Sequence, residues 1–144
     1  MTDQRATSPD LGYRPSVMIV DDDAEMRALL RDALERDGFD VREDPGDRLV
    51  PLIEGRAPDA IVLDKEMAGL NGLDLLSYIR QRHPVLPVIV VTAFGGTEVE
   101  AEALRRGATY YIDKPFRVAR LLAMLRAALS QAAQGTRRRW AEYG

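Results

Sequence analysis

The stretch IVLDKEMAGLNG, residues 61–72, joins a hydrophobic run directly to a carboxylate. An uninterrupted apolar run that contains β-branched residues is typical of a strand covered on both faces. The run stops at Asp64, and the glycine and asparagine residues that follow favour a turn. We therefore expect a buried strand over residues 60–63 that delivers Asp64 to the rim of a sheet.

Four more segments have the character of strands, and helical patterns separate them. The strands are expected at residues 17–20, 39–43, 87–91 and 109–112. Apolar residues spaced three or four apart predict helices around residues 26–34, 49–53, 73–79, 99–104 and 118–129. Gly38 and Gly107 are placed to end the first and fourth helices. Strand and helix therefore alternate five times.

This alternation predicts an α/β fold in three layers, a doubly wound parallel sheet with helices on both faces. Parallel strands need crossover connections, and helices usually provide them. Ligands of such sheets bind beyond the carboxyl ends of the strands. The residues that follow the expected strands are therefore the place to look for chemistry.

Those residues are Asp21, Asp22, Asp64, Thr92 and Lys114. Since parallel strands present their carboxyl ends on one side, we expect these side chains to converge. Three neighbouring carboxylates repel one another and cannot all stay ionised without a counter-charge. The pattern therefore indicates a site for a cation.

Magnesium suits such a site, because Mg2+ prefers oxygen ligands and commonly binds one or two carboxylates together with phosphate oxygens. The chain has no cysteine and a single histidine, so a zinc site is not expected. Lys114 and Thr92 are donors suited to phosphate oxygens. A carboxylate can itself be a nucleophile that forms an aspartyl phosphate, and Asp64, alone at the end of a central strand, is the candidate.

Four motifs in this sequence occur together in order and spacing: VMIVDDDAEMR (17–27), IVLDKEMAGLNGLDLL (61–76), VIVVTAF (88–94) and YYIDKPF (110–116). They resemble the signatures of the receiver domain of bacterial two-component response regulators. The resemblance covers about residues 16 to 130. It implies a flavodoxin-like (βα)5 fold with strand order 2-1-3-4-5.

The domain division that follows has three parts. Residues 1–16 are expected to form a flexible N-terminal arm, and residues 17–130 the receiver domain. Residues 131–144, which include Arg137, Arg138 and Arg139, are expected to form a C-terminal tail or linker.

The resemblance assigns a role to each motif residue. It implies that Asp64 is the phosphoacceptor and that Asp21 and Asp22 hold Mg2+, with Asp22 the more direct ligand. The backbone carbonyl of Glu66, two residues past the acceptor, would complete the protein's share of the metal ligands.

The remaining motif residues are implied to sense the phosphoryl group. Thr92 matches the switch hydroxyl, Lys114 the lysine that binds phosphate, and Tyr111 an aromatic switch that turns inward on phosphorylation. Ala93 matches a position kept small near the phosphate. The Lys114–Pro115 bond matches one that is cis in the family.

Variable positions beside the phosphate are implied to tune how fast water reaches it. Lys65, Glu66 and Phe94 occupy these positions here. Ala68 stands where the family usually has proline, so the loop past the acceptor loses one rigid point. Asp23 is interpreted as a residue that starts the first helix, and not as a metal ligand.

The function implied is a switch in a phosphorelay. A sensor histidine kinase or phosphotransfer protein would donate a phosphoryl group to Asp64, with Mg2+ as cofactor. The output surface would be the face formed by the fourth helix, the fifth strand and the last helix. A homodimer would form through the same face. Such a protein is not an enzyme beyond its own phosphorylation and dephosphorylation. Direct DNA binding is not expected, because about 14 residues follow the last expected helix. A stand-alone receiver and a part of a longer regulator both stay open.

Two other functions stay open. A phosphatase of the haloacid dehalogenase class also combines an aspartate nucleophile with Mg2+, threonine and lysine, but it has aspartate where Glu66 stands. A degenerate receiver would bind a partner without phosphorylation, although all five key residues are present here.

Composition limits the partners and the location. The 144 residues carry a net charge of −3, which offers no general attraction to nucleic acid or acidic lipid. Apolar runs are far shorter than the roughly 18 residues that a membrane span needs, and the first 16 residues lack the apolar centre of a signal peptide. We therefore expect a cytoplasmic protein.

Overall fold

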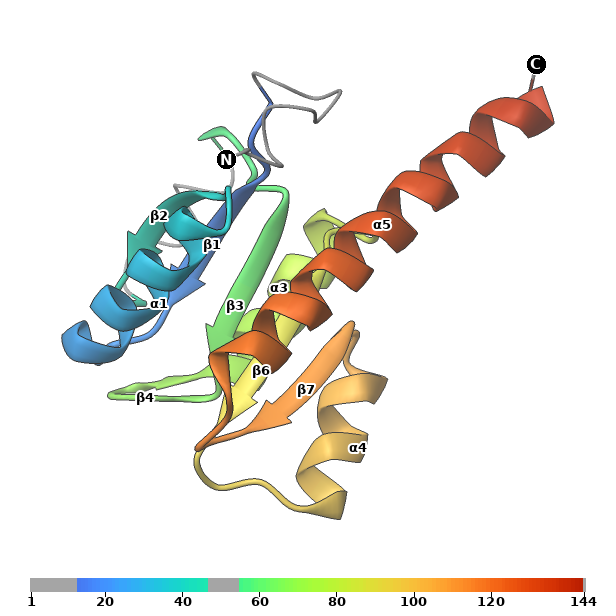
Figure 1. The fold of residues 1–144 in the computed structure, drawn as a ribbon. Coiled ribbons are helices and arrows are strands. Elements are labelled where there is room, and N and C mark those ends of the chain that lie inside the picture. Colours follow the sequence, from blue (N-terminus) through green and yellow to red (C-terminus); the bar gives the residue numbers. More distant parts are fainter. Residues whose placement is uncertain (1–12, 47–54, 144) are drawn as a thin grey trace.

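The fold is built on one parallel five-stranded sheet (Figure 1). The computed structural model describes residues 13–46 and 55–143. The strands of the sheet are β1 (Ser16–Val20), β2 (Asp40–Asp44), β3 (Ala60–Asp64), β6 (Val88–Thr92) and β7 (Tyr110–Asp113), in the order β2-β1-β3-β6-β7. Counted along the chain, these are strands 2-1-3-4-5, so the expected order and the α/β class are confirmed.

Helices cover both faces of the sheet. They are α1 (Ala24–Arg36), α3 (Gly72–Arg82), α4 (Thr97–Arg105) and α5 (Val118–Tyr143). One core cluster joins β1, β3 and β6 to α3 and to Ala103 of α4, whereas a second joins the opposite face of these strands to Leu30 of α1 and Leu121 of α5. The expected three layers are therefore present.

Alternation along β1 shows how the two core clusters are separated. Val17 and Ile19 pack with α1 and α5, and Met18 and Val20 pack on the side of α3. All four side chains have no exposed surface. Because successive side chains of a strand point to opposite faces, a continuous apolar run can supply both layers at once.

The first helix begins and ends as the sequence predicts. The Asp23 carboxylate accepts hydrogen bonds from the backbone N–H groups of Glu25 and Met26, so Asp23 is the N-cap of α1. Gly38, with φ of 97°, follows the end of the helix. The cap satisfies helix N–H groups that have no partner inside the helix.

A small hairpin follows β3, and the sequence interpretation missed it. The strands β4 (Glu66–Met67) and β5 (Leu70–Asn71) pair antiparallel. Gly72 then lies so close to the strand end that a Cβ atom on it would come within 2.4 Å of the Asp64 carbonyl oxygen. The chain past Asp64 is therefore held firmly against the start of α3.

The two ends of the chain differ from expectation in detail. Ser16 belongs to β1, and Tyr13 donates a hydrogen bond to the Asp59 carboxylate at 3.0 Å, so the last residues of the expected arm contact the fold. The helix α5 continues to Tyr143 and extends beyond the sheet (Figure 1), so residues 131–143 are helical. Whether that segment acts as a linker stays a prediction.

Some expectations concern residues that are not described. The helix expected at residues 49–53 and most of the arm, residues 1–12, lie outside the described residues, as do the side chains of Arg137, Arg138 and Arg139. Within residues 13–46 and 55–143, no helix combines the length and the apolar character that crossing a membrane requires.

Candidate functional site

The candidate site lies at the carboxyl ends of β1, β3, β6 and β7. Asp21 and Asp22 follow β1, Asp64 is the last residue of β3, Thr92 ends β6 and Lys114 follows β7. The strand register places these ends side by side, with Asp64 opposite Val91 and Thr92 opposite Asp113. The parallel sheet therefore brings residues from four separate motifs to one rim.

Three carboxylates and one ammonium group meet at this rim. One oxygen from each of Asp21, Asp22 and Asp64 lies within 4.8 Å of the others. The Lys114 ammonium lies 3.5 Å from an oxygen of Asp21 and 3.5 Å from Oδ1 of Asp64. One cation against three carboxylates leaves a strongly negative site.

The Asp64 carboxylate is buried, and one of its oxygens accepts no hydrogen bond within the described residues. Its residue is only 4% exposed, and within the described parts of the chain its Oδ1 accepts no hydrogen bond. Burial, together with repulsion from Asp21, raises the pKa of the Asp64 carboxyl to about 6, although Lys114 opposes the shift. A buried carboxylate oxygen that accepts no hydrogen bond is costly, even with the Lys114 ammonium 3.5 Å away, so this atom is suited to meet a ligand.

The donor set fits a magnesium ion. Among the residues that the structure describes, the ligand atoms of this cluster are carboxylate oxygens. Two of the three carboxylates are buried, and the third, on Asp22, is exposed. Asp64 Oδ1 accepts no hydrogen bond within the described residues and has only the Lys114 ammonium 3.5 Å away, so it can serve as one of the ligand atoms. Hard oxygen donors with room for water match the preferences of Mg2+.

Backbone N–H groups orient the two acids after β1. The Asp23 N–H donates to Asp21 Oδ1 at 2.9 Å, and the Ala68 N–H donates to Asp22 Oδ2 at 2.7 Å. Proline has no N–H, so the second bond depends on Ala68 standing where the family usually has proline. Sequence reasoning missed this contact, because it joins residues 46 positions apart.

Glu66 turns its side chain toward the end of β6. The Thr92 hydroxyl donates a short hydrogen bond to Glu66 Oε2, and the Ala93 N–H donates to Oε1 at 3.0 Å. The Lys65 ammonium also lies 3.3 Å from Oε2. Burial by itself would raise the pKa of the Glu66 carboxyl, but these donors outweigh burial and hold that pKa below its usual range.

Thr92 is fully buried, and its hydroxyl has partners on both sides. The oxygen accepts a hydrogen bond from the Phe94 N–H at 3.0 Å while the hydroxyl donates to Glu66. Phe94 itself is 73% exposed. The predicted switch hydroxyl is therefore held in place by its own loop and by Glu66.

Tyr111 reaches the loop that follows Thr92. Its hydroxyl donates to Asp113 at 2.8 Å and accepts from the Gly96 N–H at 3.3 Å. A Cβ atom on Gly95 would come within 1.9 Å of that hydroxyl oxygen, so the approach needs glycine. Burial and the Asp113 carboxylate raise the pKa of Tyr111 to about 12. The Lys114–Pro115 bond is cis, as the resemblance implied.

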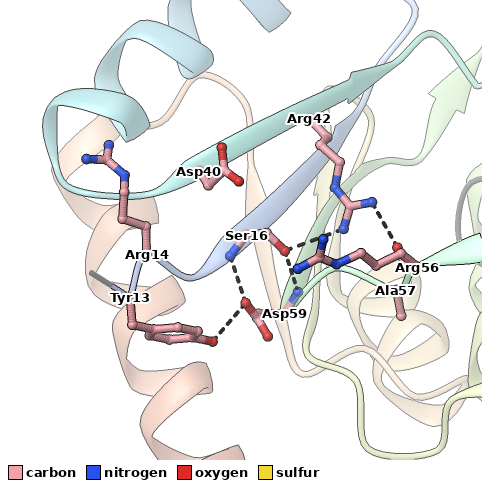
Figure 2. Close-up of a pocket in the computed structure, with 8 residues that line it drawn as sticks. All are labelled: Tyr13, Arg14, Ser16, Asp40, Arg42, Arg56, Ala57 and Asp59. Carbon is pink, nitrogen blue, oxygen red and sulfur yellow. Dashed lines mark hydrogen bonds between the residues drawn. The ribbon is translucent and has the colours of Figure 1, made fainter. Parts of the chain in front are cut away.

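A second polar hollow lies at the opposite end of the sheet (Figure 2). Its volume is about 600 Å³, and its lining includes Arg14, Arg42 and Arg56. The Asp59 carboxylate there accepts from the Ser16 N–H at 2.8 Å as well as from Tyr13, and Arg42 donates to the Arg56 carbonyl at 2.8 Å. The hydrogen bonds around this hollow join the start of β1 to the start of β3, at the end of the sheet away from the three carboxylates.

Known proteins resemble this chain over most of its length. The model of the response regulator receiver domain matches residues 17–126. The DNA-binding transcriptional regulator NtrC of Salmonella typhimurium is 36% identical over 118 residues, which are 81% of this chain and 25% of NtrC. The chain therefore spans about a quarter of the length of that curated relative.

Solved structures of single domains are also similar. The receiver domain of NtrX from Brucella abortus is 35% identical, with a TM-score of 0.73 over 79% of this chain and 98% of that domain. The beryllofluoride-activated NtrC4 receiver domain dimer is 28% identical, with a TM-score of 0.77 over 81% of this chain and 98% of that chain.

Proposed function

The chain belongs to the response regulator receiver family, and from this we propose that Asp64 accepts the phosphoryl group by which such a domain is switched. The observation that carries the proposal is the buried Asp64 carboxylate, whose Oδ1 accepts no hydrogen bond within the described residues and lies 3.5 Å from the Lys114 ammonium. The attacking oxygen of a nucleophile must not be occupied by hydrogen bonds.

The proposed reaction transfers a phosphoryl group from a phosphohistidine of a sensor histidine kinase or phosphotransfer protein. An Asp64 carboxylate oxygen forms the new O–P bond while the N–P bond of the donor breaks, and the electron pair of that bond stays with the histidine ring. Transfer of this kind needs mainly positioning and neutralisation of charge.

Mg2+ is the proposed cofactor, and when bound it would neutralise phosphoryl charge in the acidic site. Asp21, Asp22 and Asp64 would hold it together with the Glu66 backbone carbonyl. Asp22 is kept in position for this role by the N–H of Ala68. The family match and the acidic cluster support this assignment.

Lys114 and Thr92 would bind the transferred group. The Lys114 ammonium already lies beside Asp64, so it would contact a phosphoryl oxygen without a large movement. The Thr92 hydroxyl would donate to another oxygen, and small Ala93 would leave space for the group. Lys65, Glu66 and Phe94 would set how long the phosphoryl group survives.

The output is proposed to use the face of α4, β7 and α5. Tyr111 of β7 bonds to Gly96, at the start of α4, and so links that face to the loop after Thr92. The activated NtrC4 receiver domain is a dimer, which supports a homodimer as one output state of this chain. We also propose a cytoplasmic location and no catalysis beyond self-phosphorylation and self-dephosphorylation.

The haloacid dehalogenase alternative is less well supported. That reaction needs a general acid two residues past the nucleophile, and Glu66 at that position is held by Thr92 and Ala93. A carboxylate with a lowered pKa is poorly suited to donate a proton. A degenerate receiver would not need all five key residues, which this chain has.

The test is phosphorylation by acetyl phosphate with Mg2+, followed by intact-mass measurement. We expect the native chain to gain one phosphoryl group, Asp64→Asn to gain none, and Asp59→Asn, at the other end of β3, to behave like the native chain. Equal labelling of Asp64→Asn would contradict the proposal. Repeated turnover of a phosphomonoester would favour the hydrolase instead.

A further inference from the structure

Glu66 contacts the two donor groups that β6 presents at its end. The Thr92 hydroxyl donates to one carboxylate oxygen and the Ala93 N–H donates to the other, at 3.0 Å. These donors belong to successive residues, so the two oxygens of one carboxylate can each accept one hydrogen bond. Charge-assisted bonds of this type are stronger than bonds between neutral groups.

The strand register places the residues that carry these donors beside the end of β3, where a phosphoryl group on Asp64 would sit. In the parallel register Asp64 lies opposite Val91, the residue directly before Thr92. A phosphoryl group carries anionic oxygens that accept from O–H and N–H groups just as a carboxylate does. Thr92 is fully buried, so its hydroxyl has few other anions to meet.

We propose that the Glu66 carboxylate is an internal anion that holds the Thr92 hydroxyl and the Ala93 N–H until a phosphoryl group on Asp64 displaces it. This inference rests on the proposed function of Asp64. Both anions cannot use the two donors together, because the donors are shared and like charges at short range repel. Phosphorylation is therefore an exchange of one anion for another.

The surrounding structure lets the Glu66 side chain leave while its backbone stays. The backbone is fixed by the β4–β5 pairing and by the bond from the Gly72 N–H to the Lys65 carbonyl at 2.9 Å. The Glu66 side chain is 28% exposed and has solvent to move into. Lys65, with its ammonium 3.3 Å from the same carboxylate, can follow it outward.

The exchange has a direct consequence for the switch. Thr92 is already hydrogen-bonded to an anion in the unphosphorylated protein, so its hydroxyl does not begin from an unpaired state. The loop after β6 keeps its N–H groups bonded before and after phosphorylation. The group that changes place is the Glu66 side chain, which makes Glu66 a positioning residue and a competitor of the phosphoryl group.

The test compares beryllofluoride binding to the native chain, Glu66→Gln and Glu66→Ala, each at saturating Mg2+. Beryllofluoride stands in for the phosphoryl group on Asp64. We expect both variants to bind it about tenfold more tightly, the effect of removing one charge-assisted competitor. Both variants keep the backbone carbonyl of residue 66. Glu98→Gln, which removes the same charge from an exposed position of α4, should bind as the native chain does.

A second readout separates competition from a structural role. In the native chain, the side-chain carboxyl carbon of Glu66 should change its NMR chemical shift when beryllofluoride binds, while the Ala93 amide proton stays hydrogen-bonded. A Glu66 carboxyl signal that does not move, with variants that bind no more tightly than the native chain, would overturn the inference.

Failure of the inference can be told apart from failure of the proposed function. Suppose that the native chain binds beryllofluoride, Asp64→Asn does not, and the Glu66 variants show native affinity. Then the proposed competition between the Glu66 carboxylate and the phosphoryl group is wrong, and the phosphoacceptor role of Asp64 stands. If the native chain and Asp64→Asn respond equally, the phosphoacceptor role of Asp64 is wrong, and the competition falls with it.

Discussion

Two aspartates bracket the same strand of this protein and have opposite surroundings. Asp59 precedes β3, and its carboxylate accepts hydrogen bonds from Ser16 and Tyr13 (Figure 2). Asp64 ends β3, and its Oδ1 accepts none within the described residues, although Asp64 is the more buried of the two. A satisfied carboxylate stabilises the fold, whereas an unsatisfied buried one is available to a ligand.

The two ends of the sheet also differ in how their charged groups are paired. At the carboxyl end, the Lys114 ammonium lies beside the cluster of three carboxylates formed by Asp21, Asp22 and Asp64. At the amino end, guanidinium groups are bonded to backbone carbonyls, as Arg42 is to Arg56 and Arg14 is to Phe39. The hollow at the amino end is about 600 Å³ in volume, yet guanidinium groups there already have hydrogen-bond partners. Its size alone is therefore no sign of a functional site.

The largest expected difference between the two ends is in chemistry. Lys114→Ala removes the cation beside Asp64, and we expect phosphorylation by acetyl phosphate to slow by about 100-fold or more, as when one donor is removed from a site that stabilises developing charge. Arg42→Ala removes a cation from the other end and should leave the rate within about twofold. The rate is measured by intact mass against time. Equal slowing in both variants would contradict the proposed difference between the two ends of the sheet.

The second expected difference is in stability. Without Mg2+ at about pH 7.5, Asp64→Asn should raise the free energy of unfolding by about 2 kcal/mol, because it removes a buried charge that Asp21 repels. Asp59→Asn should lower it by about 1 kcal/mol, because it weakens charge-assisted hydrogen bonds. Urea unfolding in the presence of a chelator measures both. Changes of the same sign in the two variants would show that the ends do not differ as proposed.

The third expected effect, which has the same origin as the gain in Asp64→Asn, is the pH dependence of stability. The pKa of Asp64 is about 6 in the folded protein, above its ordinary value of 3.8, so the folded state binds the proton more tightly than the unfolded state does. Stability from this group is therefore present at low pH and is lost as pH rises from about 4 to about 6, by an amount on the order of 2 kcal/mol.

Matched variants identify the source of that pH dependence. Chelator-treated Asp64→Asn should lose this part of the slope in urea unfolding measured across the same pH range, and Asp59→Asn should keep it. Saturating Mg2+ should restore stability above about pH 6, because a ligand that binds only the folded state stabilises it. An unchanged slope in Asp64→Asn would assign the pH dependence to another group.

Much of the fold could be predicted, because it depends on patterns that are local in the chain. The strand that ends at Asp64 was expected over residues 60–63 and is observed at Ala60–Asp64, since four apolar residues in a row suit a strand buried on both faces. The cap at Asp23 and the turn at Gly38 were predicted from single residue types. The β4–β5 hairpin was missed, because two-residue strands carry no periodic signal.

The composition of the candidate site was predicted better than its contacts. Asp21, Asp22, Asp64 and Lys114 do come together at one rim, as parallel strands require. The hydrogen bond from the Ala68 N–H to Asp22 was not predicted. The two hydrogen bonds that Glu66 accepts, from Thr92 and Ala93, were not predicted either. Neither contact has a signal in the sequence around it.

By itself, the sequence determined the order of strands and helices, the end of each strand at which polar residues gather, and the family to which the motifs point. These properties follow from spacings along the chain. Only the tertiary structure decided that Asp64 Oδ1 is buried and accepts no hydrogen bond from the described residues, and that Glu66 accepts one from Thr92, a residue 26 positions away. Burial and side-chain hydrogen bonds depend on atoms that folding brings together from distant parts of the chain, so their pattern is absent from any one stretch of it.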